Sequence, residues 1–125
     1  MSTETPALVS SFMLDCITAK QVERYAEASG DRNPIHLSWK AAQEAGLDAP
    51  IVHGAFIIGQ FEKLLRVWRP KSIIRSMSVQ FVAPLPVGSS LQVSGRVASS
   101  CEVCTIRLAA RSQAKLVAVG HAVLT

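Results

Sequence analysis

The second half of the chain alternates apolar and polar residues in four successive segments, which limits its possible folds more than any other feature. We assign to one face Met77, Val79, Phe81; Leu91, Val93, Gly95, Val97; Cys104, Ile106, Leu108, Ala110; and Val117, Val119, His121, Val123. A period of two is typical of a β-strand, because successive side chains point to opposite faces. Four such strands in succession predict an antiparallel sheet with one apolar face.

A long apolar helix is predicted directly before these strands. It begins near Gly54 and continues to about Val67, and Pro70 ends it because proline lacks a backbone N–H. Its apolar residues surround most of the circumference: Phe56, Ile57, Ile58, Phe61, Leu64, Leu65 and Val67. Such a helix is predicted to be buried. The order of elements therefore predicts an α+β domain whose antiparallel sheet wraps around a central apolar helix.

The first part of the chain supplies shorter elements. We expect a strand over 7–14, a helix from Thr18 to Gly30, a loop over 31–37 and a short helix over 39–45. Thr18 and Gln21 have the spacing of a capping box, and Gly30 suits the end of the helix. Pro34 disfavours helical geometry at the residue before it, which favours a loop.

Length and composition indicate a single domain spanning 1–125. A chain of 125 residues with 49% hydrophobic content can form one compact core but is too short for two ordinary domains. No apolar stretch approaches the roughly 20 residues that a membrane helix needs, and residues 1–6 lack the pattern of a signal peptide. We therefore expect a cytoplasmic protein without a membrane partner.

Charge and cysteine content favour neither nucleic-acid nor metal binding. The net charge is +4, but basic residues are dense only over 63–75, where no recognised nucleic-acid motif is present. This stretch is interpreted as a solvated face, with steering of an anionic cofactor ester as the alternative. Cys101 and Cys104 are close together, but neither Cys16 nor any other cysteine pair completes a zinc site. We predict no metal and no disulfide.

The strongest candidate for chemistry is the loop that contains Asp31 and His36. A carboxylate and an imidazole lie five residues apart with Pro34 between them. A loop stiffened by proline can bring both groups to one point, as general acid–base chemistry requires. Each residue alone is a weak signal, because aspartate also favours turns for local reasons.

The complete string Ser29-Gly30-Asp31-Arg32-Asn33-Pro34-Ile35-His36 closely resembles the hydratase-2 motif of the MaoC-like dehydratase family, which includes the (R)-specific enoyl-CoA hydratases. Further segments resemble the same family: Pro50-Ile51-Val52-His53-Gly54, the strand and turn over 81–88, and Gly120-His121-Ala122. The resemblance covers the chain from about Cys16 to its end. It implies a hotdog fold and reversible addition of water across the 2,3 double bond of an enoyl thioester.

The resemblance also implies roles for individual residues. Asp31 and His36 would hold and activate water, Asn33 would help orient the site, and the backbone N–H of Gly54 would bind the thioester oxygen. An exposed N–H at a helix N-terminus favours negative charge, and glycine permits close approach. No cofactor is implied beyond the coenzyme A or acyl carrier protein that forms part of the substrate. His53 receives no catalytic role, because a histidine at a helix start commonly caps or packs.

Two residues depart from the family pattern. Ser38 occupies a position that is often acidic in related enzymes, and Glu62 lies where short-chain hydratases tend to have a small residue lining the acyl pocket. Glu62 is interpreted either as an exposed partner of Arg66 at i+4 or as a residue that shortens the acyl pocket.

Glu62 also keeps a second function open, because some hotdog thioesterases use a carboxylate on the central helix. A third alternative is a non-catalytic acyl-thioester binding module, since a fold does not fix a function. For each of these we expect a homodimer or a multiple of dimers, because one helix and a short sheet leave an edge strand and an apolar face uncovered.

Overall fold

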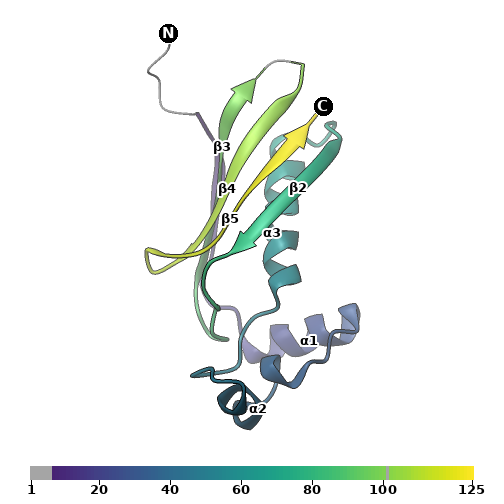
Figure 1. Cartoon of the computed structure of the whole chain (residues 1–125). Helices are drawn as coiled ribbons and strands as arrows, with labels where there is room; N and C mark the ends of the chain where they lie inside the picture. Colours follow the sequence, from purple (N-terminus) through teal and green to yellow (C-terminus); the bar gives the residue numbers. More distant parts are fainter. Residues whose placement is uncertain (1–6, 101) are drawn as a thin grey trace.

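The computed structural model describes residues 7–100 and 102–125. Residues 1–6 and Cys101, on which part of the leader and cysteine predictions rests, lie outside these ranges. The elements are β1 (Leu8–Leu14), α1 (Ala19–Ser29), the 3₁₀ helix η1 (Pro34–His36), α2 (Trp39–Glu44), α3 (Gly54–Trp68), β2 (Ile74–Phe81), β3 (Leu91–Ser100), β4 (Cys104–Ser112) and β5 (Lys115–Leu124). Figure 1 shows α3 alongside the sheet, with α1 and α2 grouped at one end.

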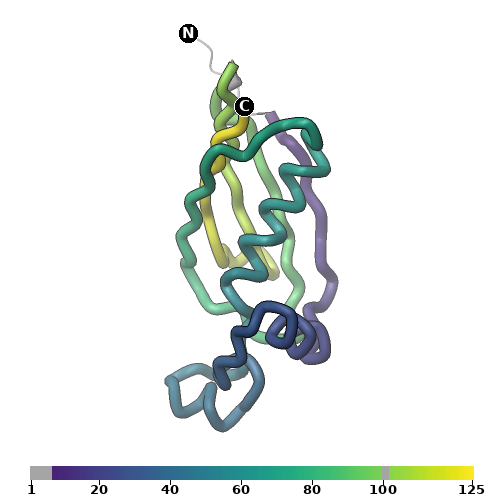
Figure 2. Tube along the Cα trace, turned by 90° about the vertical axis from the view of Figure 1, so that its right-hand side faces the viewer, coloured from purple at the N-terminus to yellow at the C-terminus, as the bar shows by residue number. Residues whose placement is uncertain are grey.

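The strands form one antiparallel sheet in the order β1-β3-β4-β5-β2, so β1 and β2 are its edges. Helix α3 lies across one face of this sheet (Figure 2). Phe61, Leu64 and Leu65 of α3 are buried against the inner face of the sheet, where Leu91, Val93, Ile106 and Leu108 are also buried. The predicted antiparallel sheet around a central helix, and with it the hotdog fold, is confirmed.

The surroundings of α3 differ from the prediction. Ile57, Phe61, Leu64 and Leu65 are buried, whereas Val67 is 72% exposed. The sheet covers only one side of the helix, so residues on the other side face outward in the single chain. The prediction that the helix is buried on all sides is therefore wrong for one copy of the chain, and the apolar residues left outside need another explanation.

The inner face of β5 also differs from the prediction. Ala118, Ala122 and Leu124 are buried, while His121 is exposed. Ala118 pairs with Ala110 and Leu116 with Arg111, which leaves Val117 as the extra residue of a β-bulge. Beyond a bulge, alternation continues on the opposite face, so the assignment of Val119, His121 and Val123 to the inner face is wrong.

The first helix has the predicted ends. Gln21 donates its backbone N–H to Thr18 Oγ1 at 3.1 Å, and the Gln21 side chain accepts from the Thr18 N–H at 2.9 Å. Gly30 follows the helix with φ of 80°, a left-handed conformation that glycine adopts without strain. The capping box and the glycine stop are thus confirmed, and they set where the next loop begins.

Helix α2 begins after Ser38, whose hydroxyl accepts from the Ala41 N–H.

Cys16 is an exposed free thiol and Cys104 a buried one. Within residues 7–100 and 102–125, no helix has both the length and the apolar composition needed to cross a membrane.

Candidate active site

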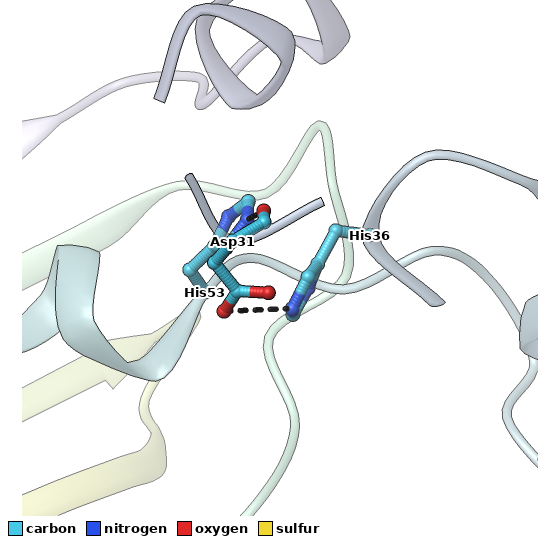
Figure 3. Close-up of side chains that lie close together, drawn as sticks. All are labelled: Asp31, His36 and His53. Atoms are coloured by element: carbon cyan, nitrogen blue, oxygen red, sulfur yellow. Dashed lines mark hydrogen bonds and ion pairs between the residues drawn. The ribbon is translucent and has the colours of Figure 1, made fainter. Parts of the chain in front are cut away.

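The loop between α1 and α2 brings Asp31 and His36 together. Ser29 Oγ accepts the backbone N–H of Asp31 at 3.1 Å, and Asp31 Oδ1 accepts the N–H of Asn33 at 3.2 Å. The second carboxylate oxygen, Oδ2, lies 3.8 Å from His36 Nε2 (Figure 3). The two side chains therefore converge as the loop pattern predicts, although His36 is only 8% exposed and the Asp31 side chain is 53% exposed.

The short helix η1 turns the chain between these two residues. Asn33 Oδ1 accepts the N–H of Ile35 at 3.2 Å, which caps η1, and Pro34 occupies its first turn. His36 follows at the end of this single turn, so its ring returns toward Asp31. The oxygen of the Asn33 side chain therefore builds the loop itself, while its predicted role toward substrate stays a prediction.

One hydrogen bond determines which nitrogen of His36 carries the proton. His36 Nδ1 lies 2.7 Å from the carbonyl oxygen of Ile51. A carbonyl oxygen can only accept, so Nδ1 must be the donor and carry hydrogen in this contact. In the neutral ring the remaining nitrogen, Nε2, is then an acceptor that faces Asp31. The loop thus presents an imidazole lone pair beside a carboxylate.

The structure adds His53 to this pair (Figure 3). His53 is 1% exposed, and its ring stacks on that of His36 with centroids 3.7 Å apart and planes at 24°. Its Nε2 donates to the backbone carbonyl of Asp31 at 2.9 Å. Tyr25 packs against the His53 ring at 4.8 Å. His53 occupies the N-cap position of α3 but makes no side-chain cap bond.

The segment before α3 is joined to the loop by further hydrogen bonds. The N–H of Ile51 donates to the carbonyl of Ile35 at 3.1 Å, and the Ile51 carbonyl accepts from His36. Together with the bond from His53 to Asp31, these contacts fasten both ends of the loop to residues 51–53. Gly54 follows directly, so the first turn of α3 lies next to the pair.

Gly54 is the first residue of α3. The helical hydrogen bonds at this end begin with the N–H groups of Phe56 and Ile57, which donate to the carbonyl of His53. The N–H of a residue at this first position has no partner within the helix. A Cβ atom at Gly54 would lie 2.8 Å from Cζ of Phe81, so the missing side chain lets the Phe81 ring lie against the backbone.

Two cavities adjoin these residues. One of about 370 Å³ is lined by apolar residues beside Gly54, including Ile57, Phe81 and Leu85. Another of about 240 Å³ is lined by His36 together with Leu37, Trp39, Pro50, Val87, Ala19 and Glu23. Both have predominantly apolar walls near a few polar groups, as sites for small molecules commonly do.

Asp31, His36 and His53 each offer a ligand atom within 4.8 Å of the others. A ring nitrogen binds a metal along a direction in its own ring plane, and the planes of the stacked His36 and His53 rings are only 24° apart, which does not suit two ligands of one ion. Each ring also has one nitrogen bonded to a backbone carbonyl. The three side chains therefore do not present a convergent ligand set, and we assign no metal to them.

Glu62 lies apart from this site. Its Oε1 accepts from Nε of Arg66 at 2.9 Å, and both side chains are about half exposed. Glu62 lines neither of the two cavities beside Gly54 and His36. The interpretation as an exposed ion pair at i+4 is therefore confirmed in the single chain.

The fold and the loop together define a hotdog domain that presents an aspartate and a histidine at the start of its central helix. Residues 9–118 match the family model described as "MaoC like domain". The chain therefore belongs to the MaoC-like domain family, and the family resemblance noted in the sequence is confirmed.

Two enzymes and one solved structure are similar to this chain. The chain is 34% identical over 84 residues to a 3-hydroxybutyryl-CoA dehydratase of Methylorubrum extorquens, covering 66% of this chain and 54% of that protein. It is 35% identical over 75 residues to an (R)-specific enoyl-CoA hydratase of Aeromonas caviae, covering 58% and 56%. The matched segment thus spans about half the length of these relatives. The solved (R)-hydratase from A. caviae superposes with a TM-score of 0.87 at 28% identity, covering 99% of this chain and 97% of that one.

Proposed function

We propose that this protein is an enoyl-thioester hydratase that adds water reversibly across the 2,3 double bond to form a 3-hydroxyacyl thioester. The observation that carries the proposal is the separation of 3.8 Å between Asp31 Oδ2 and His36 Nε2. Nε2 is free to accept there because the hydrogen on Nδ1 of His36 is donated to the Ile51 carbonyl. Relatives named as a 3-hydroxybutyryl-CoA dehydratase and an (R)-specific enoyl-CoA hydratase support this reaction class.

The distance of 3.8 Å between Asp31 Oδ2 and His36 Nε2 suits one water molecule bound to both atoms. It exceeds a direct hydrogen bond, but a water about 2.8 Å from each atom can bond to both at once. Both Asp31 Oδ2 and the lone pair of His36 accept, so they bind the two hydrogens of the water and direct its oxygen lone pairs outward. A water held in this way is oriented for attack on an electrophilic carbon.

In the proposed reaction, the water oxygen bonds to the β-carbon while one member of the pair accepts a proton. The electrons of the double bond move toward the thioester carbonyl, which becomes enolate-like. A proton then returns to the α-carbon, so that water is added overall and no redox step occurs. His36 and Asp31 have the types of side chain that transfer protons in this manner.

The developing negative charge on the thioester oxygen needs a donor. Gly54 offers a backbone N–H at the first position of α3, where the helix dipole adds positive potential. Donors placed where charge develops stabilise the transition state more than the substrate. The apolar cavity beside Gly54 supports placing the thioester there. The proposal leaves either coenzyme A or acyl carrier protein as the carrier and requires no other cofactor.

Incubation with crotonyl-CoA tests the reaction class. A hydratase lowers the absorbance of the conjugated enoyl group without releasing free thiol. Release of thiol would instead identify the hotdog thioesterase that Glu62 suggested, and binding without either signal would identify an acyl-thioester binding module. The position of Glu62 in an exposed ion pair gives the thioesterase no structural support in the single chain.

The proposed active form is a homodimer or a multiple of dimers. Phe81 and Val82, at the end of edge strand β2, are 48% and 53% exposed, and Ile58 of α3 is 37% exposed. The cavity beside Gly54 is lined by both Phe81 and Val82, so a second copy covering them would also enclose the site. Light scattering that shows a monomer at micromolar concentration would contradict this arrangement.

A further inference from the structure

We infer that His53 is a positioning residue that holds Asp31 and His36 in register for the proposed hydration. The inference rests on the proposed function, and it assigns to a buried side chain a task that its place at a helix start does not suggest. His53 touches each member of the pair through a different part of its ring. The two contacts can therefore be removed separately.

The first contact anchors the backbone of Asp31. Asp31 follows Gly30, a residue type with wide backbone freedom, and the Asp31 side chain is half exposed. The donor that fixes its carbonyl is the buried Nε2–H of His53 at 2.9 Å. With the carbonyl held and Oδ1 bonded to the Asn33 N–H, the direction of Oδ2 toward His36 is set.

The second contact fixes the plane of His36. The bond from Nδ1 to Ile51 holds one edge of the ring, but a ring can still tilt about a single hydrogen bond. The His53 ring lies against its face at 3.7 Å, and Tyr25 supports His53 in turn at 4.8 Å. The stack restricts this tilt and keeps Nε2 directed at the space shared with Asp31 Oδ2.

The choice of histidine at this position is costly for stability, which points to function. Because Nε2 donates to a carbonyl, the neutral ring has an unprotonated Nδ1, and this atom is buried without a partner among the described residues. Buried polar atoms are normally paired, so an exception requires a reason. Phenylalanine would supply the ring face and glutamine a side-chain donor, but imidazole supplies both at once.

The test compares His53→Phe, which keeps an aromatic face without the donor, with His53→Gln, which keeps an N–H donor without the ring. His53→Ala removes both. With crotonyl-CoA, His53→Ala is expected to lose about 10²-fold in kcat with KM little changed, because displacement of catalytic groups by about 1 Å costs this much. The Phe and Gln variants should each retain more of kcat than the Ala variant. Because Phe and Gln also refill space that Ala leaves empty, each kcat is compared per folded molecule, and the form of the His36 ring distinguishes positioning from packing.

The matched control is Val22→Ala. Val22 is buried in α1 and contacts neither member of the pair in any described interaction. It should lower the unfolding temperature while leaving kcat per folded molecule unchanged. A His53→Ala variant with normal kcat, or one whose loss only follows its unfolded fraction as in Val22→Ala, would overturn the inference. Phe and Gln variants both as slow as Ala would overturn the separate roles of the two contacts.

A measurement without turnover separates this inference from the proposed function. Nitrogen chemical shifts of the histidine rings report which nitrogen carries hydrogen. In the wild type, His36 should show hydrogen at Nδ1, which donates to the Ile51 carbonyl. His53→Ala leaves the ring free to tilt away from that carbonyl, so the form with hydrogen at Nε2 should gain population. Absence of enoyl consumption by the wild type, with the enoyl group carried on coenzyme A and on acyl carrier protein, would refute the proposed function alone. If His36 keeps its hydrogen at Nδ1 to the same extent in His53→Ala, the positioning role is refuted whatever the reaction.

Discussion

The backbone N–H of Gly54 provides the sharpest test of where the thioester lies. Gly54→Pro removes this donor at a position where proline is compatible with the helix, because the first N–H has no intrahelical partner. Gly54 is not among the residues with positive φ, and His53 before it is extended with φ of −60° and ψ of 134°. Both conditions suit a proline at this point. The expected loss is about 10²–10³-fold in kcat, equivalent to about 2.7–4 kcal/mol of transition-state stabilisation.

Proline also adds carbon atoms, and this effect must be separated from the loss of the donor. Any Cβ at residue 54 would lie 2.8 Å from Cζ of Phe81, which is closer than real Cβ atoms approach. That atom is the tip of a half-exposed ring, so the ring can move aside. Gly54→Ala adds the same Cβ and keeps the N–H, which makes it the matched control. The ratio of kcat between the Ala and Pro variants therefore removes the contribution of the Cβ and leaves that of the lost N–H and the proline ring.

The assay measures kcat and KM for crotonyl-CoA from the loss of enoyl absorbance, with thermal unfolding recorded for each variant. Because the donor acts mainly on the developing enolate, its loss should lower kcat more than it raises KM. A folded Gly54→Pro variant with the same kcat as Gly54→Ala would show that the carbonyl is polarised elsewhere. The placement of the substrate beside α3 would then be wrong.

Three further variants or pairs test other parts of the structure. Asp31→Asn and His36→Ala should each lower kcat by about 10²–10⁴-fold, and the double variant should be no slower than about the worse single one, whereas losses that multiply would contradict a shared water. Glu62→Ser should leave the preference between four-carbon and eight-carbon enoyl substrates unchanged, and it should shift the free energy of unfolding by less than about 1 kcal/mol. Higher activity of this variant on the eight-carbon substrate would place Glu62 in the acyl pocket. Gly120→Ala should destabilise by about 1–3 kcal/mol in chemical denaturation, because its Cβ would contact the backbone of β2. Gly59→Ala, in open space on α3, should instead stabilise by about 0.5–1 kcal/mol, and the same sign for both would refute the packing argument.

Most of the fold could be predicted because its signals are local. The alternation in the second half, the capping box at Thr18 and the stop at Gly30 each depend on residues close in sequence. The inner face of β5 could not be predicted, because the bulge at Val117 arises from pairing with β4 and from two bonds of its carbonyl to Val82 and Ala83. A single extra residue reversed every later assignment on that strand.

The exposed side of α3 shows a different limit. Apolar residues around the helix indicate burial, but the sequence does not say whether the covering surface comes from the same chain. In the single chain the sheet covers Phe61 and Leu65, while Ile58 and Val67 remain outside. The apolar pattern is consistent with the proposed second copy. It would then reflect burial of α3 in the dimer, and not only burial within one chain.

The residues of the site also differ in whether they could be predicted, depending on whether their contacts are close or distant in sequence. Asp31 and His36 could be found because the loop that joins them is short and its string is specific. His53 could not, because its contacts reach Asp31 across 22 residues and depend on how the segment before α3 folds back onto the loop. Its residue type was visible, but its partners were not.

The hydrogen bonds between residues 51–53 and the loop over 31–36 also fix the parts of the site relative to one another. Ile51 donates to the loop and accepts from His36, His53 donates to Asp31, and Gly54 is the next residue. The groups proposed to hold water and the N–H proposed to bind the thioester oxygen are therefore fixed to one another over four residues of chain. Attack at the β-carbon and charge at the carbonyl oxygen belong to one transition state, so the distance between these groups matters more than the position of either. A change that loosens residues 51–53 should accordingly impair both water activation and carbonyl polarisation, even when neither Asp31, His36 nor Gly54 is altered.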